Sequence, residues 1–188
     1  METEGEVLFL KNQTGPLAES YRITGLLPAH IQSPINHTDA ILNEITRSGN
    51  LILVHNTFAD SKTISEVMKR GNTYWCLCPA SNLYIEGRIP PVEMMISLGC
   101  EIVIGTDSLA SNNQLSIMSE LKILQKHIPS LMLEDLVRWS TINGARALGE
   151  EHNYGKIEPG MNPGLLLLQD VDLQNFKLLP ESIVTRLI

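Results

Sequence analysis

Residues 51–78 have the sequence LILVHNTFADSKTISEVMKRGNTYWCLC, in which an apolar run, an amphipathic stretch and a second apolar run follow one another. The first run, residues 51–55, has the length and the β-branched content of a buried strand. Asp60 can then cap a helix that Gly71 ends, and residues 74–78 form the next strand-like run. The segment therefore predicts a strand–helix–strand unit.

The same alternation continues on both sides of this segment. Further helical patterns cover residues 39–47, 90–99, 115–127 and 133–148, and a third strand-like run covers 101–105. Alternating strands and helices predict right-handed crossovers and a parallel sheet covered on both faces, as in an open doubly wound sheet or a (β/α) barrel. The absence of G-x-G-x-x-G and P-loop motifs disfavours a nucleotide-binding open sheet.

The chain changes character after Gly155, where turn-forming residues precede two short β-like runs at 165–168 and 182–185. A small β addition to the α/β part is therefore expected.

The 188 residues carry 14 Lys and Arg against 21 Asp and Glu, without a basic cluster, which argues against nucleic acid and anionic membrane as partners. A small-molecule substrate, neutral or cationic, fits better.

No signal peptide or membrane-spanning stretch is evident, so a soluble, cytoplasmic protein is expected. The three cysteines, Cys76, Cys78 and Cys100, are then interpreted as reduced core residues.

Polar residues follow each of the three predicted strands. His55 ends the first, Ser81 and Asn82 follow the second, and Asp107 follows the third. Because reactive side chains emerge at the carboxyl ends of parallel strands, His55 and Asp107 are expected to point from neighbouring strands into one opening. The alternatives are a hydrogen-bonded strand-end histidine, a capping aspartate and, for Ser81 and Asn82, a simple turn.

Several motifs at these positions together carry a resemblance to a known family. They are the strand-end His55 sixteen residues before Gly71, then CPASNLYIEG (78–87), LGCEIVIGTDSLASNN (98–113), STINGARALG (140–149) and GKIEPGMNPGLLLL (155–168). In this order and spacing the chain resembles the amidohydrolase superfamily. It is most similar to the branch of guanine deaminase, methylthioadenosine/adenosylhomocysteine deaminase and the chlorohydrolase-like enzymes.

The resemblance implies an α/β fold, the C-terminal half of a TIM-like (β/α)8 barrel with part of a small β-sandwich domain. Residues 1–155 would supply about strands six to eight of the barrel with their helices, and residues 156–188 part of the sandwich. Asp107 would bind the metal and shuttle a proton, and His55 would contact substrate and steady developing charge. Residues 1–7, METEGEV, resemble the tail of the family's H-x-x-E-T-x-x-E-V motif after strand five, so Glu2 would protonate the substrate ring. The alternative for Glu2 is a solvated N-terminal glutamate. The motif residues Ser81, Asn82 and Ser108 would help to bind substrate.

The resemblance also implies missing parts, because the family's H-x-H motif and its strand-five histidine have no counterpart here. His30, His37, His127 and His152 match no ligand position. The complete enzyme would use a divalent metal, zinc before iron, but this chain alone would bind none tightly and would be inactive. Open sheet edges would then be covered by self-association or by a missing N-terminal half.

Three functions stay open at this point. The first is a metal-dependent hydrolase that deaminates an amino-purine, nucleoside or similar heterocycle. The second is a non-catalytic fragment or interaction module that keeps the barrel packing without metal. The third is a doubly wound domain that binds a small ligand.

Overall fold

The computed structural model describes residues 1–26, 45, 48–162 and 164–188. Most of the helix expected at 39–47, together with His30 and His37, lies outside these residues. The described elements are α1 (Glu4–Asn12), α2 (Gly15–Thr24), β1 (Leu51–Val54), α4 (Ser61–Met68), β2 (Thr73–Leu77), α5 (Pro79–Glu86), α6 (Val92–Ser97), β3 (Glu101–Ile104), α7 (Ile117–His127), α8 (Leu133–Ser140), α9 (Ile142–Ala147), β4 (Leu166–Asp172) and β5 (Lys177–Arg186). Within the described residues, no helix is long and apolar enough to cross a membrane.

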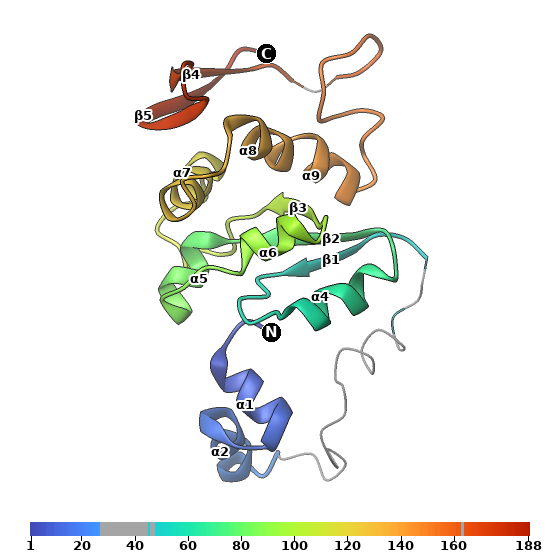
Figure 1. Cartoon of the computed structure of the whole chain (residues 1–188), viewed down its shortest axis with the longest axis vertical. Coiled ribbons are helices and arrows are strands. Elements are labelled where there is room, and N and C mark those ends of the chain that lie inside the picture. Colours follow the sequence, from blue (N-terminus) through green and yellow to red (C-terminus); the bar gives the residue numbers. More distant parts are fainter. Residues whose placement is uncertain (27–44, 46–47, 163) are drawn as a thin grey trace.

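A three-stranded parallel sheet lies at the middle of the molecule, in the order β1-β2-β3 (Figure 1). The predicted parallel pairing is thus confirmed. One expectation was wrong: His55 and Asp107 do not follow neighbouring strands, because β2 lies between β1 and β3. Both strands nevertheless point the same way and end at the same edge of the sheet. The order of the strands along the sequence does not tell whether two strands are adjacent in the sheet or have a third strand between them.

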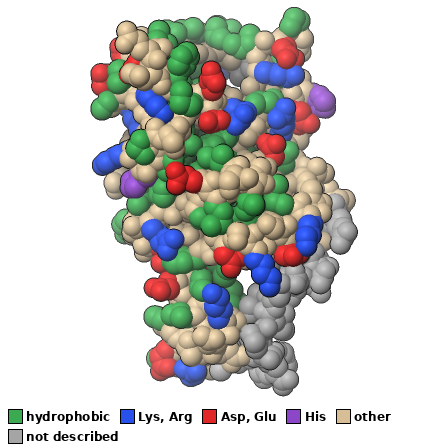
Figure 2. Space-filling view, in the orientation of Figure 1, with side chains coloured by type: hydrophobic (Ala, Val, Ile, Leu, Met, Phe, Trp, Pro, Cys, Tyr) green, Lys and Arg blue, Asp and Glu red, His purple; other side chains and the backbone are tan. Residues whose placement is uncertain are grey.

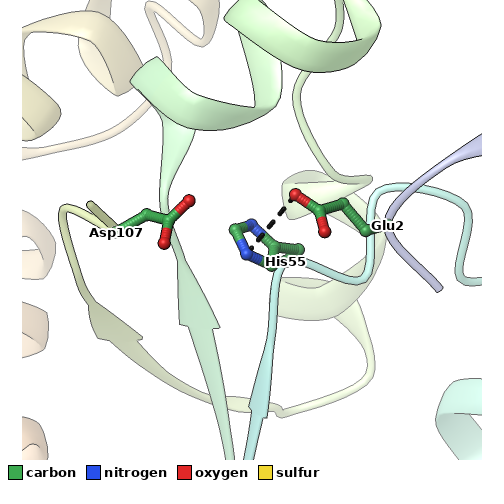
Figure 3. Close-up of side chains that lie close together, drawn as sticks. All are labelled: Glu2, His55 and Asp107. Atoms are coloured by element: carbon green, nitrogen blue, oxygen red, sulfur yellow. Dashed lines mark ion pairs between the residues drawn. The ribbon is translucent and has the colours of Figure 1, made fainter. Parts of the chain in front are cut away.

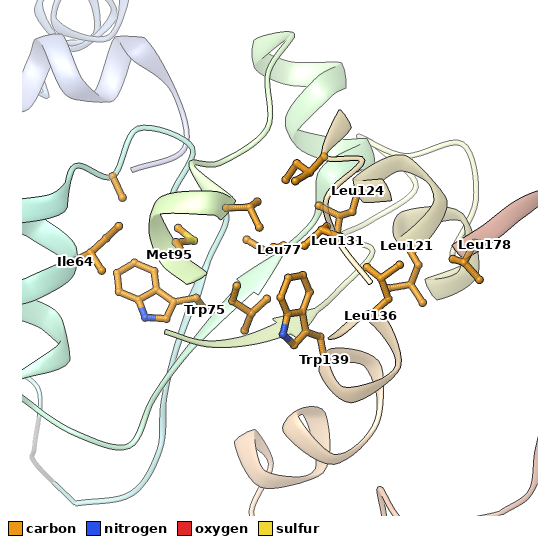
Figure 4. Close-up of a cluster of buried hydrophobic side chains, with 14 of the residues drawn as sticks. Ile64, Trp75, Leu77, Met95, Leu121, Leu124, Leu131, Leu136, Trp139 and Leu178 are labelled. Carbon is orange, nitrogen blue, oxygen red and sulfur yellow. The ribbon is translucent and has the colours of Figure 1, made fainter. Parts of the chain in front are cut away.

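The hydrophobic core lies between the sheet and its helices (Figure 4). β2 contributes Trp75 and Leu77, which are almost fully buried. α4 begins as predicted, with Asp60 accepting a hydrogen bond from the Thr63 backbone amide at 2.7 Å. Its apolar face at helical spacing buries Ile64 and Val67 against the same core.

Two predicted elements differ in detail from the observed ones. The helix expected over 133–148 is broken at Thr141, where φ −125° and ψ −94° are not helical, so it forms α8 and α9. The predicted turn at Ser81 and Asn82 is instead the first part of α5, which Pro79 opens. Proline is favoured in the first turn of a helix, so Pro79 starts a helix here as well as ending a strand.

A two-stranded antiparallel hairpin, β4 and β5, forms the C-terminal β addition (Figure 1). It packs on the α/β part through Leu178, which belongs to the main core cluster. The side chain of Gln125 on α7 forms hydrogen bonds with both backbone polar groups of Leu178. Its Nε2 donates to the Leu178 carbonyl at 2.6 Å, and its Oε1 accepts from the Leu178 amide at 2.8 Å.

Candidate active site

Glu2, His55 and Asp107 point toward one another at the carboxyl edge of the parallel sheet (Figure 3). One donor atom of each residue lies within 4.8 Å of the others. His55 Nε2 and Glu2 Oε1 are 3.5 Å apart. Residues from three distant parts of the chain therefore place their donor atoms within reach of one small ion.

The backbone turns sharply where β1 and β3 end. His55 has φ 65° and Asp107 has φ 58°, both in the left-handed region that non-glycine residues seldom occupy. Such strained positions are kept where the surrounding structure fixes them, and they gather at functional sites. The His55 amide still donates to the Cys76 carbonyl at 3.0 Å, so the turn follows the last ladder bond directly.

Asp107 is held by two serine hydroxyls. Its Oδ2 lies 2.5 Å from Ser111 Oγ and 2.8 Å from Ser81 Oγ, and the two hydroxyls are 2.9 Å apart. These hydrogen bonds, that of Ser111 first, lower the pKa of Asp107 below its ordinary value. Asp107 is thus a carboxylate at neutral pH, and its Oδ1 stays free of the two serine hydroxyls.

His55 is held from behind by Asn82, which is fully buried on α5. Asn82 Nδ2 lies 3.3 Å from His55 Nδ1 and donates to Thr57 Oγ1 at 2.8 Å. The direction of the bond between Asn82 and His55 Nδ1 depends on the imidazole tautomer, and the other ring nitrogen, Nε2, faces Glu2. Asn82 Oδ1 is buried and has no hydrogen-bond partner within the described residues.

Glu2 comes from the segment before α1 and is fixed by the start of that helix. Its backbone amide donates to Glu6 Oε2 at 2.7 Å, and Thr3 and Glu6 form a reciprocal capping box. The Glu4 amide also donates to Glu86 Oε2 on α5 at 3.3 Å, which links this segment to the sheet edge. The side chain of Glu2 is thereby directed toward His55.

The remaining predicted residues take different places. Ser81 and Asn82 are fully buried behind Asp107 and His55, whereas Ser108 is exposed beside Asp107, with its hydroxyl accepting from the Ala110 amide at 3.3 Å. Sequence reasoning gave no role to four residues around the site, which are Thr57, Ser111, Asn112 and Glu120. Ser111 and Asn112 belong to the motif at residues 98–113 that carries the family resemblance, so the sequence did point to these two.

The donor set suits a divalent cation. Two carboxylates and an imidazole are ligands that zinc accepts, and a catalytic zinc has three protein ligands and one open position. His55 Nε2 and Glu2 Oε1 are 3.5 Å apart and lie within 4.8 Å of an Asp107 oxygen, so both groups would stand close to an ion held by Asp107. Asp107 is therefore a suitable ligand for a metal ion, with Glu2 and His55 beside it.

Comparison with known proteins agrees with this geometry. The sequence model described as "Amidohydrolase family" matches residues 31–186, which is most of the chain. The chain belongs to the amidohydrolase family. The resemblance that the motifs carry is thereby confirmed.

Individual members of the amidohydrolase family match over much of the chain. It is 32% identical over 158 residues to the 5-methylthioadenosine/S-adenosylhomocysteine deaminase of Pyrococcus abyssi, covering 79% of this chain but 35% of that protein. The aminofutalosine deaminase of Helicobacter pylori, solved in complex with methylthio-coformycin, matches with TM-score 0.71 and 26% identity, over 87% of this chain and 40% of that one. An adenosine deaminase from Xanthomonas campestris with bound zinc matches with TM-score 0.62 and 28% identity, over 83% and 34% respectively.

These amidohydrolase neighbours imply a TIM-barrel-like fold for the region compared. The chain spans well under half the length of each of them.

Proposed function

We propose that this chain carries part of the active site of a metal-dependent hydrolase that deaminates an adenosine-like nucleoside. The observation that supports the proposal most is the convergence of Glu2, His55 and Asp107 at one sheet edge. The relatives support the reaction class, since they are deaminases named for adenosine-like compounds. Residues 1–155 would belong to the barrel and residues 156–188 to the sandwich.

Asp107 would hold the metal ion, with zinc preferred over iron, and Glu2 and His55 would lie beside it. A bound divalent ion would supply Lewis acidity that brings the pKa of a coordinated water near neutrality. The lowered pKa of Asp107 keeps it ionised at neutral pH, which is the form that a metal ligand needs. The same carboxylate would receive the proton released by the attacking water.

The other two residues would act on the substrate. Glu2 would donate a proton to the ring nitrogen next to the carbon under attack, and His55 would stabilise the developing negative charge. Water would form the new C–O bond, and one of its protons would pass by way of Asp107 to the amine, which leaves as ammonia when the C–N bond breaks. The second water proton would return to Glu2 as the new C–OH becomes a carbonyl. Ser108, exposed beside Asp107, would contact substrate. Ser81 and Asn82, assigned from the sequence to substrate binding, are placed to act mainly by orienting Asp107 and His55.

The experiment is ammonia release from 5′-methylthioadenosine by the full chain supplied with zinc or iron(II), together with metal analysis after dialysis. Retained stoichiometric metal and ammonia production that Asp107→Asn abolishes would support the proposal. Asp135→Asn is the matched control, because Asp135 lies on α8 and pairs with Arg138 at 2.7 Å, away from the site. Absence of both metal and ammonia would favour the non-catalytic module.

A further inference from the structure

Glu120, on α7, is a carboxylate with no exposed surface. None of the ion pairs between described residues includes it. Its partners are neutral: the Ala80 backbone amide donates to Oε2 at 2.8 Å, and Asn112 Nδ2 donates to Oε1 at 2.6 Å. Burial raises the pKa of Glu120. A buried carboxylate without a cation is costly for stability, so its presence needs an explanation.

The two partners of Glu120 adjoin the two hydroxyl donors of Asp107. Ala80 precedes Ser81, and Asn112 follows Ser111. Both serine hydroxyls lie against Asp107 Oδ2, at 2.8 Å and 2.5 Å. The Glu120 carboxylate thus fixes the two chain segments whose serine hydroxyls hold the Asp107 carboxylate.

Asn112 adds a second constraint to the loop that carries Asp107. Its Nδ2 also donates to the Thr106 carbonyl at 2.7 Å, immediately before Asp107. The alternative is that Glu120 only stabilises the start of α5. That role would require only the bond to the Ala80 amide and would leave the bond to Asn112 unexplained.

We propose that Glu120 is a positioning residue for Asp107, holding the Ser81 and Ser111 hydroxyls so that the carboxylate presents its free oxygen toward Glu2 and His55. This inference rests on the proposed function in one respect, namely that Asp107 is a metal ligand. Residues behind metal ligands orient them, and their loss weakens metal binding about 10- to 100-fold.

The test is cobalt(II) affinity of the full chain, measured by competition with a chromophoric chelator, for the unaltered protein and for Glu120→Gln. Glutamine keeps the size, but its amide nitrogen must face one of the two N–H donors, so one hydrogen bond is lost. We expect the affinity to fall by up to about tenfold, the lower end of the range for groups bonded directly to a ligand, because Glu120 acts through Ser81 and Ser111. Glu66→Gln, at an ion pair on the surface of α4, is the control and should leave affinity unchanged.

A double-mutant cycle separates positioning from general structural damage. If Glu120 acts through the serine hydroxyls, Glu120→Gln and Ser111→Ala will be strongly non-additive in cobalt affinity, whereas independent damage would give additive losses. Asn112→Ala, at a half-buried position, removes the bond to Glu120 together with the bond to the Thr106 carbonyl. It gives a second measurement of the same support if Glu120→Gln does not fold.

The outcomes distinguish the inference from the proposed function. Tight cobalt binding by Glu120→Gln or Asn112→Ala, or additive losses in the cycle, would overturn the inference and leave the proposed function standing. No cobalt binding by the unaltered chain would count against the metal role of Asp107. In that case, amide hydrogen exchange at Ala80 and residues 106–112 still decides: faster exchange in Glu120→Gln supports the positioning role, and unchanged exchange refutes it.

Discussion

Asp107 is an exposed carboxylate whose acidity is set by its neighbours. Ser111 Oγ lies 2.5 Å from its Oδ2 and is the first cause of its lowered pKa. We expect Ser111→Ala to raise the pKa of Asp107 toward its ordinary value, measured by ¹³C NMR titration of the side-chain carboxyl. Ser140→Ala, on α8, is the control. An unchanged Asp107 pKa would show that the hydroxyl does not stabilise the carboxylate.

The sign of the pH effect follows from the direction of this shift. Because the pKa of folded Asp107 lies below its unfolded value of about 3.9, the ionised group stabilises the fold above that pH. The contribution is lost as pH falls through the folded pKa. Ser111→Ala should therefore reduce stability at neutral pH while changing it less under strongly acidic conditions.

Position at strand ends identified His55 and Asp107 from the sequence, since parallel strands present their last residues at one edge. The residues that hold them could not be found this way. Ser81 meets Asp107 across 26 positions, and Ala80 meets Glu120 across 40. Contacts of this separation depend on how helices pack, which local patterns do not encode.

At the scale of the element, the start of α4 depends on one side chain. Asp60 Oδ1 accepts from the Thr63 amide at 2.7 Å. Asp60→Ala should lower the free energy of unfolding by about 1 kcal/mol, because a helix-start amide loses its partner. Asp60→Asn keeps an accepting oxygen and should cost much less. Urea denaturation measures both, and equal losses would argue against capping.

Gly105 lies where the end of β3 passes two thiols. A Cβ there would meet Cys76 Sγ at 2.8 Å and Cys78 Sγ at 3.2 Å. Gly105→Ala should therefore destabilise the fold by about 1–3 kcal/mol through overpacking. Gly144→Ala, in α9 with nothing within 4 Å of the added carbon, should be neutral or up to about 1 kcal/mol stabilising. Thermal unfolding distinguishes them, and a neutral Gly105→Ala would contradict the close packing.

The elements themselves were largely predictable, because the apolar strands and the amphipathic helices carry clear periodicities. β1, β2, β3, α4 and α7 lie where the patterns indicate. The break at Thr141 was missed because its neighbours continue a helical pattern and the backbone departs without a proline. On α6, Val92 and Met95 are buried but Ile96 is 44% exposed, because this short helix buries one narrow face.

Over the whole molecule, apolar side chains remain exposed at both edges of the structure. The hairpin exposes Leu166, Ile183 and Val184, and β1 exposes Ile52 and Val54. Figure 2 shows apolar side chains at the surface over the hairpin end of the molecule. A cavity of about 1160 Å³ also lies between this hairpin and α7–α9. Contiguous exposed apolar surface marks interaction surfaces or sites of aggregation.

We therefore expect that the chain alone does not behave as a stable monomer, either self-associating or requiring a partner polypeptide. Sedimentation velocity over a range of concentrations measures this directly. Replacing Ile183 and Val184 by Thr should shift the distribution toward smaller species. A monodisperse monomer with cooperative unfolding would contradict the expectation.

The metal site at Glu2, His55 and Asp107 is tested most directly by a crystal structure of the chain grown with zinc, with anomalous diffraction recorded on both sides of the zinc edge. The account predicts one strong anomalous peak among these three residues, about 2.1 Å from an Asp107 carboxylate oxygen. A zinc peak bound elsewhere, for example at Cys76 and Cys78, or no peak beside Asp107 at saturating zinc, would contradict it.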